Sequence, residues 1–198
     1  KNIRPRDIVT IDSLVNAARV VAATGGSTNA ALHLPAIANE AGLKFTLRDV
    51  VEIYNSTPYI GDMQPGGKYV AKDLYDVGGV PVVIKSLLDG GYINGDCITV
   101  TGKTIAENHK EVIFPTNQDV VYKCDNPISE NSSVVGLWGN LAPDGCISKI
   151  AGLKKLTFKG KAKCFDSEED ALTAVLKNEI KAGDAVIIRY EGPKGGPG

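Results

Sequence analysis

The sequence has 198 residues, of which 43% are hydrophobic, and its 22 lysines and arginines almost balance its 23 aspartates and glutamates, leaving a net charge of −1. A chain of this length and composition can bury one large core or two small ones. The near-zero charge provides no basic surface for nucleic acid, and no apolar run approaches a membrane span, so we expect neither a nucleic acid nor a membrane as partner.

The chain begins with helical patterns. Thr10 is expected to cap a helix over roughly 11–23, because apolar residues recur on one side of that stretch. A second helix is expected near 28–41, with Gly42 placed to end it. Pro35 should kink this second helix or divide it in two, because proline lacks the backbone N–H that an inner helical turn needs.

A glycine-rich loop joins these two helices: Gly25-Gly26 followed by Ser27, Thr28 and Asn29. The glycines permit a tight turn and the close approach of a ligand, and Ser27 or Thr28 is the expected N-cap. N–H groups at a helix start attract carboxylates and phosphates, so the loop is a candidate anion-binding site. The alternative is an ordinary capped helix, which the spacing alone favours.

Further helices and one short strand follow. Thr46 opens a capping-box pattern for the next helix, and a strand is expected over 59–62. Helices are then expected near 69–77 and over 82–89, and Thr104 caps one more short helix. This order of helices and strand indicates an α/β layer.

The pattern changes after about His109. Short apolar runs separated by polar turns predict strands at 112–114, 120–122, 134–138, 146–147, 156–158, 162–165 and 185–190. Ser167 caps the one helix that interrupts them. We therefore place a domain boundary between about 110 and 120. The predicted fold is a helix-rich α/β part over 1–115 followed by a β-rich, barrel-like part over 116–198.

Isolated polar residues each have a structural interpretation. Asp62 ends the expected strand beside a glycine-rich loop, and is either a functional carboxylate or a turn-former. His33 is interpreted as a hydrogen-bonded core residue and His109 as a solvated residue near a helix end. The stretch 101–104 is similar to the end of a phosphate-binding P-loop, but Cys97 stands where that loop needs a glycine.

The four cysteines are Cys97, Cys124, Cys146 and Cys164. They contain no Cys-x-x-Cys pair, so their spacing predicts neither a zinc site nor a redox site. Such sparse cysteines are typical of a reducing compartment and of free, mostly buried thiols.

The exact residues of the glycine loop are more specific than the spacing of its glycines. The run Thr24-Gly25-Gly26-Ser27-Thr28-Asn29, followed by Leu32-His33-Leu34, resembles the family of dihydroxy-acid and sugar-acid dehydratases. Further stretches resemble the family in the same order and cover nearly the whole chain: 64–69, 77–81, 95–104, 139–145, 165–171 and 189–198. The stretch 95–104 resembles the dihydroxy-acid branch more than the phosphogluconate branch.

The resemblance implies a fold and an activity. The chain would comprise the end of a helix-rich α/β N-terminal domain and the start of a β-rich, barrel-like, swivelling C-terminal domain. The implied enzyme is a hydro-lyase that converts 2,3-dihydroxy-3-methyl carboxylic acids to 2-keto acids in valine and isoleucine biosynthesis. The alternatives are a sugar-acid dehydratase of the aldonate or 6-phosphogluconate type, and a non-catalytic binding domain that keeps the fold.

The resemblance also implies cofactors. The family binds an Fe–S cluster, expected here as 2Fe–2S, through three cysteines, and holds magnesium with acidic residues and a modified lysine. In the family pattern these ligands lie before residue 1, and a further carboxylate and the serine base lie after residue 198. We therefore expect an internal fragment that contains no catalytic residue and no metal ligand, and that is inactive alone.

Substrate-facing residues are implied in two loops: Gly25, Gly26, Ser27, Thr28 and Asn29 in the first, and Lys194, Gly195 and Gly196 in the second. The expected partner is a small dihydroxy acid. The family further implies a homodimer, located in the cytoplasm of a bacterium or in an organelle of a eukaryote.

Overall fold

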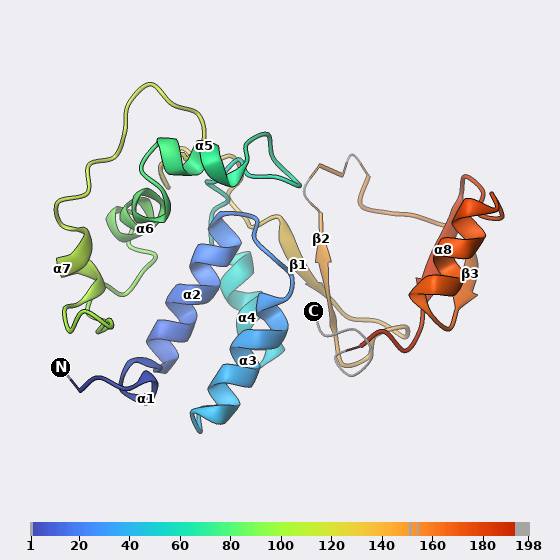
Figure 1. Cartoon of the computed structure of the whole chain (residues 1–198), viewed down its shortest axis with the longest axis horizontal. Coiled ribbons are helices and arrows are strands. Elements are labelled where there is room, and N and C mark those ends of the chain that lie inside the picture. Colours follow the sequence, from blue (N-terminus) through green and yellow to red (C-terminus); the bar gives the residue numbers. More distant parts are fainter. Residues whose placement is uncertain (1, 151, 154, 193–198) are drawn as a thin grey trace. The chain divides into compact units, whose positions relative to one another are not determined.

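A computed structural model of the chain describes residues 2–150, 152–153 and 155–192. The chain divides into two compact units, Lys1–Gly152 and Leu153–Gly198. Helices and strands occur in both units, which confirms the α/β class (Figure 1). No helix in the described part of the chain is both long enough and apolar enough to cross a bilayer.

The first unit contains the expected helices: α2 (Ile11–Ala23), α3 (Ala30–Glu40), α4 (Leu47–Asn55), α5 (Ala71–Asp76), α6 (Val80–Asp89) and α7 (Ile105–His109). It also contains the short helix α1 (Pro5–Ile8), which is not among the helices expected from the sequence. The side chains of Thr10, Thr46 and Thr104 each accept a hydrogen bond from a backbone N–H in the first turn of α2, α4 and α7, respectively. These N-caps were predicted correctly because capping is a local interaction.

The start of α3 differs from the prediction. Asn29, not Ser27 or Thr28, is the N-cap, and its side chain makes no capping hydrogen bond. The Ser27 hydroxyl instead accepts from the Asn29 N–H at 3.2 Å, within the turn that precedes the helix. Side-chain bonds of this kind compete with a helical cap, and here they delay the helix start by a residue or two.

Pro35 lies inside α3, so the expectation that it could divide the helix is wrong. Ala31, Leu34 and Ala38 on one face of α3 are buried in the core, and this packing keeps the segment helical although Pro35 cannot donate a backbone hydrogen bond.

His33 lies off the buried face of α3 and is exposed, so its interpretation as a core residue is wrong. His109 is half-buried rather than solvated, with Nδ1 2.7 Å from the Ile105 carbonyl oxygen.

A core of small and branched residues joins α2, α3 and α4, which pack side by side (Figure 1). Ala18 and Ala22 on α2 are fully buried, and such small side chains let helices approach closely. Strand β1 (Val134–Leu137) packs against α4, and Val134 is fully buried there. A Cβ at Gly136 would overlap the Val51 side chain, so only glycine permits this approach of strand to helix.

Strand β1 pairs with β2 (Cys146–Lys149) in an antiparallel hairpin, with Val134 opposite Lys149. In the second unit, β3 (Lys161–Phe165) and β4 (Asp184–Ile188) pair in parallel and α8 (Glu168–Leu176) connects them. The strands of the described residues thus form two separate two-stranded sheets. A barrel-like domain is not confirmed, and the domain boundary at 115/116 stays a prediction.

The expected strand over 59–62 is replaced by isolated bridges, Tyr59 to Ser129 and Gly61 to Val121. The N–H groups of Ile60 and Gly61 both donate to the carbonyl of a helix residue, so no continuous ladder forms there. The stretches 112–114, 120–122 and 156–158, each expected as a strand, likewise lie outside the assigned strands.

Candidate functional site

A cavity of about 490 Å³ lies beside the loop that follows α2, entirely within the first unit. Its volume is in the range of small-molecule sites. The lining residues come from four segments: Val20, Thr24, Gly25, Gly26 and Ser27 from α2 and its loop; Met63, Gln64 and Pro65; Leu74, Val80 and Val83; and Lys149. The wall is therefore mostly apolar, with a few polar groups near the glycines.

Gly25 has two independent reasons to be glycine. Its φ of +58° lies in the left-handed region that side chains disfavour. A Cβ at this position would lie 2.8 Å from the Tyr59 ring and 2.9 Å from Ser133 Oγ. Gly25 permits the tight turn that the sequence predicts, but Tyr59 and Ser133 fill the space beside it, so a larger residue would not fit.

The end of α2 is held in place by distant donors. The N–H groups of Ile60 and Gly61 donate to the Ala23 carbonyl at 2.8 and 2.9 Å. The Ser132 hydroxyl donates to the Ala22 carbonyl at 3.2 Å. The last carbonyls of a helix have no partner within the helix, so these bonds satisfy them and fix the direction in which the glycine loop leaves.

Lys149 reaches the same loop from the end of β2. Its Nζ donates to the Gly25 carbonyl at 2.9 Å, across 124 residues of sequence. The side chain is half-buried. Among the described residues that line the cavity, Lys149 alone carries a charge. A cation in a mostly apolar wall makes the cavity suited to an organic anion.

The loop that supplies Met63 to Pro65 is shaped by Asp62, whose carboxylate accepts from the Lys68 N–H at 3.2 Å. The Asp62 carbonyl accepts from the N–H groups of Lys68 and Tyr69, and a Cβ at Gly67 would overlap the Asp62 backbone. These contacts support the turn-forming interpretation of Asp62.

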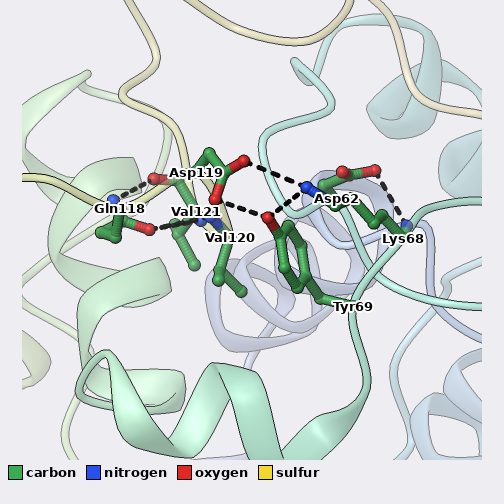
Figure 2. A network of polar contacts seen from close by, with 7 residues as sticks. All are labelled: Asp62, Lys68, Tyr69, Gln118, Asp119, Val120 and Val121. Atoms are coloured by element: carbon green, nitrogen blue, oxygen red, sulfur yellow. Dashed lines mark hydrogen bonds and ion pairs between the residues drawn. The ribbon is translucent and has the colours of Figure 1, made fainter.

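An exposed polar network ties this loop to Asp119 (Figure 2). The Tyr69 hydroxyl donates to Asp119 at 2.5 Å, and the Lys68 Nζ lies 3.3 Å from the same carboxylate. The hydrogen bond from Tyr69 lowers the pKa of Asp119. Because the groups are exposed, solvent screens them and the network contributes little to stability.

The cavity brings together part of the predicted loop site. Gly25, Gly26 and Ser27 line it, whereas Thr28 and Asn29 are not among its lining residues. A substrate role for all five stays a prediction. In the second loop, Lys194, Gly195 and Gly196 lie outside the described residues.

Sequence reasoning missed Lys149. Lys149 follows the short apolar run at 146–147. Nothing in a single sequence indicates that this run lies beside a glycine loop 124 residues earlier. The contact between Lys149 and the glycine loop becomes evident only in the folded structure, where the β1–β2 hairpin packs against α4.

The described residues offer no donor set for a metal cofactor: no group of three or more His, Cys, Asp or Glu is arranged to hold an ion. Cys146 and Cys164 are exposed and Cys97 and Cys124 are half-buried, so the expectation of mostly buried thiols is wrong. Burial raises the pKa of the Cys97 and Cys124 thiols.

The described fold is therefore of the α/β class, with a cavity of small-molecule size beside a glycine loop. Residues 1–108 match the family model for the N-terminal part of the dihydroxy-acid/6-phosphogluconate dehydratases, and residues 119–198 match the model for the C-terminal part. The chain belongs to this dehydratase family. Lys149 falls in the second matched region and Gly25 in the first, so the cavity is assembled from both.

Individual relatives are similar over the whole chain. A dihydroxy-acid dehydratase of Pelagibacter ubique is 66% identical over 100% of this chain and 35% of its own length. Dihydroxy-acid dehydratase 2 of Bradyrhizobium diazoefficiens is 62% identical over 100% of the chain and 34% of its own length. The corresponding enzyme of Dinoroseobacter shibae is 56% identical, again over 100% of the chain and 35% of its length. The chain thus spans about a third of these relatives.

Proposed function

We propose that this chain is part of a dihydroxy-acid dehydratase, a hydro-lyase that converts 2,3-dihydroxy-3-methyl carboxylic acids to 2-keto acids in branched-chain amino-acid biosynthesis. The observation that carries the proposal is the identity of 62 and 66% to proteins of that name along the entire chain. A cavity with an apolar wall and a single lysine fits a small branched carboxylic acid.

The reaction removes the C2 proton and the C3 hydroxyl, and the enol product tautomerises to the 2-keto acid. In the longer protein, an Fe–S cluster, expected as 2Fe–2S, and magnesium would supply Lewis-acid chemistry to this elimination. We propose that the ligands of those groups lie in other parts of the longer protein, since the described residues include no group of three or more His, Cys, Asp or Glu placed to hold an ion. The proposed contribution of this chain is to form one wall of the site, to bind the acid and to exclude water.

The proposed substrate wall comprises residues 25–29 and, in the second loop, 194–196. In the full-length dehydratase, Asn29→Ala should then lower kcat/KM far more than it lowers Tm. The matched control is Asn39→Ala, at an exposed position on α3 outside the cavity. Equal losses of activity and Tm in the Asn29 variant would show a purely structural role.

The remaining proposals concern the intact protein. We infer a homodimer in the cytoplasm or an organelle, and a swivelling C-terminal domain in which β3 and β4 join further strands into a barrel. The parallel pairing of β3 and β4 through a helix supports a larger sheet, since two strands alone are marginally stable. Light scattering of the purified full-length protein measures the oligomeric state.

The substrate assignment is tested with the full-length protein and a pair of acids. We expect 2-keto acid formation from 2,3-dihydroxy-3-methylbutanoate and much slower turnover of gluconate or 6-phosphogluconate. The reverse preference would show a sugar-acid dehydratase. A folded, cofactor-loaded protein that turns over neither acid would show a binding domain.

A further inference from the structure

We propose that Lys149 is the residue that binds the carboxylate of the acid in this cavity. The inference rests on the proposed function, because it takes the ligand to be a small carboxylic acid. It adds a residue that lies on β2, far in sequence from the glycine loop, and assigns it a role in substrate affinity.

The charge of the cavity lining is the first argument that Lys149 binds a carboxylate. A carboxylate that leaves water for a mostly apolar wall loses hydration, and a cation with hydrogen-bond donors offsets that loss. Lys149 alone among the described lining residues supplies a positive charge. The aliphatic side chains of Val20, Leu74 and Val83 form the apolar part of the same wall, and suit the alkyl groups at C3 of a branched acid.

The position of the Lys149 ammonium group is the second argument. An ammonium group has three N–H donors, and the bond to the Gly25 carbonyl at 2.9 Å uses one of them. That bond holds Nζ at the glycine loop, beside the cavity that Gly25, Gly26 and Lys149 all line. The base of the side chain is fixed as well, because Lys149 pairs with the fully buried Val134 in the β1–β2 hairpin. The cation is therefore preorganised, which reduces the entropy lost on binding.

The competing explanation is that Lys149 only stabilises the end of α2. Lysine side chains do bond to the last carbonyls of helices. Such a role needs a donor to the Gly25 carbonyl and no more. A carboxylate-binding role needs the charge as well, and the two roles therefore respond differently to a neutral donor at this position and to a neutral ligand.

The experiment uses full-length, cofactor-loaded dehydratase with wild type, Lys149→Gln and Lys149→Arg, and with Lys161→Gln as control. Glutamine can still donate a hydrogen bond but has no charge, and Lys161 is an exposed strand lysine in the other unit. Calorimetry measures Kd for 3-methyl-2-oxobutanoate, the keto-acid product, and for its neutral amide.

We expect Lys149→Gln to raise Kd for the acid about 10- to 100-fold, the loss typical of a charge-assisted hydrogen bond, and to change Kd for the amide by less than about threefold. KM for the dihydroxy acid should rise in parallel, and Lys149→Arg should bind the acid within about tenfold of wild type. Lys161→Gln should match wild type in every measurement.

Equal weakening of acid and amide by Lys149→Gln, or unchanged binding of both, would overturn the inference. If the glutamine variant does not fold, the arginine variant decides: equal weakening of acid and amide binding in a folded Lys149→Arg protein would also overturn it. Failure of the proposed function is a separate result, because it would appear in the wild-type protein as absence of keto-acid formation.

Discussion

Gly25 shows how one residue links backbone conformation to the shape of the cavity. It combines a positive φ with close contact to Tyr59 and Ser133. Gly42 also has a positive φ, of +75°, but a Cβ there would meet nothing within 4 Å. Substitution of Gly42 therefore tests the strain of a positive φ alone, whereas substitution of Gly25 tests that strain together with steric overlap.

Gly42→Ala should lower the free energy of unfolding by about 1 kcal/mol, the strain of a left-handed alanine. Gly25→Ala should lower it by at least about 1 kcal/mol more, because crowding adds to the strain. Urea denaturation of both variants measures the difference. Equal losses would mean that Tyr59 and Ser133 move aside without cost.

Tyr54 is the largest fully buried side chain of the core, and its hydroxyl has no hydrogen-bond partner among the described residues. Burial raises the pKa of Tyr54 to about 12. Since an unfolded tyrosine ionises near pH ~10, the neutral folded form contributes stability below that pH. The contribution is lost as pH rises from about 10 through about 12.

Tyr54→Phe should leave the free energy of unfolding at pH 7 within about 1 kcal/mol of wild type or raise it, because it removes an unsatisfied buried group. It should also reduce the loss of stability between about pH 10 and about pH 12. Tyr75→Phe, at a side chain that is 79% exposed, is the control. A drop at pH 7 of several kcal/mol in the Tyr54 variant would show that the hydroxyl has a partner.

At the scale of elements, α4 depends on its first turn. The Thr46 hydroxyl and N–H both donate to the Asp49 carboxylate at 2.6 Å, and the Asp49 N–H donates back to Thr46 at 3.4 Å. The hydrogen bond from the Thr46 hydroxyl is the largest cause that lowers the pKa of Asp49, and the backbone bond adds to it. Asp49 thus contributes stability above its ordinary pKa near ~4, and this is lost as pH falls further.

Thr46→Ala should lower the free energy of unfolding by about 1 kcal/mol, the usual cost of a lost N-cap. Asp49→Asn should flatten the acid limb of the stability profile below pH ~4. Thr173→Ala, at an exposed position inside α8, serves as the control and should not destabilise. Thermal unfolding between pH 3 and pH 7 tests both changes, and an unaltered acid limb in Asp49→Asn would contradict the role given to the carboxylate.

Helices were predictable here and strand pairings were not, for a physical reason. Thr10, Thr46 and Thr104 form caps with residues three positions away, so the sequence contains both partners of each bond. The segment 59–62 instead bonds to α2 and to residues beyond 119, and no local pattern specifies those partners. The same distinction between local and distant partners applies to the site. The Gly25 loop could be predicted from neighbouring residues, whereas the contact of Lys149 with that loop could not.

At the scale of the whole molecule, the chain is about a third of the dehydratases it resembles. If the cluster and magnesium ligands lie elsewhere in the longer protein, the 198 residues alone should take up no stoichiometric iron and form no keto acid. Metal analysis after anaerobic reconstitution, with the full-length protein as positive control, measures this. Tight iron binding or turnover by the isolated chain would contradict the division of labour proposed here.

The most direct measurement is a crystal structure of the full-length protein with the 2-keto acid product bound. Our account predicts the acid in the cavity after α2, with its carboxylate at hydrogen-bond distance from Lys149 Nζ and its alkyl group against Val20 and Val83. A product bound elsewhere, with this cavity filled only by solvent, would contradict it.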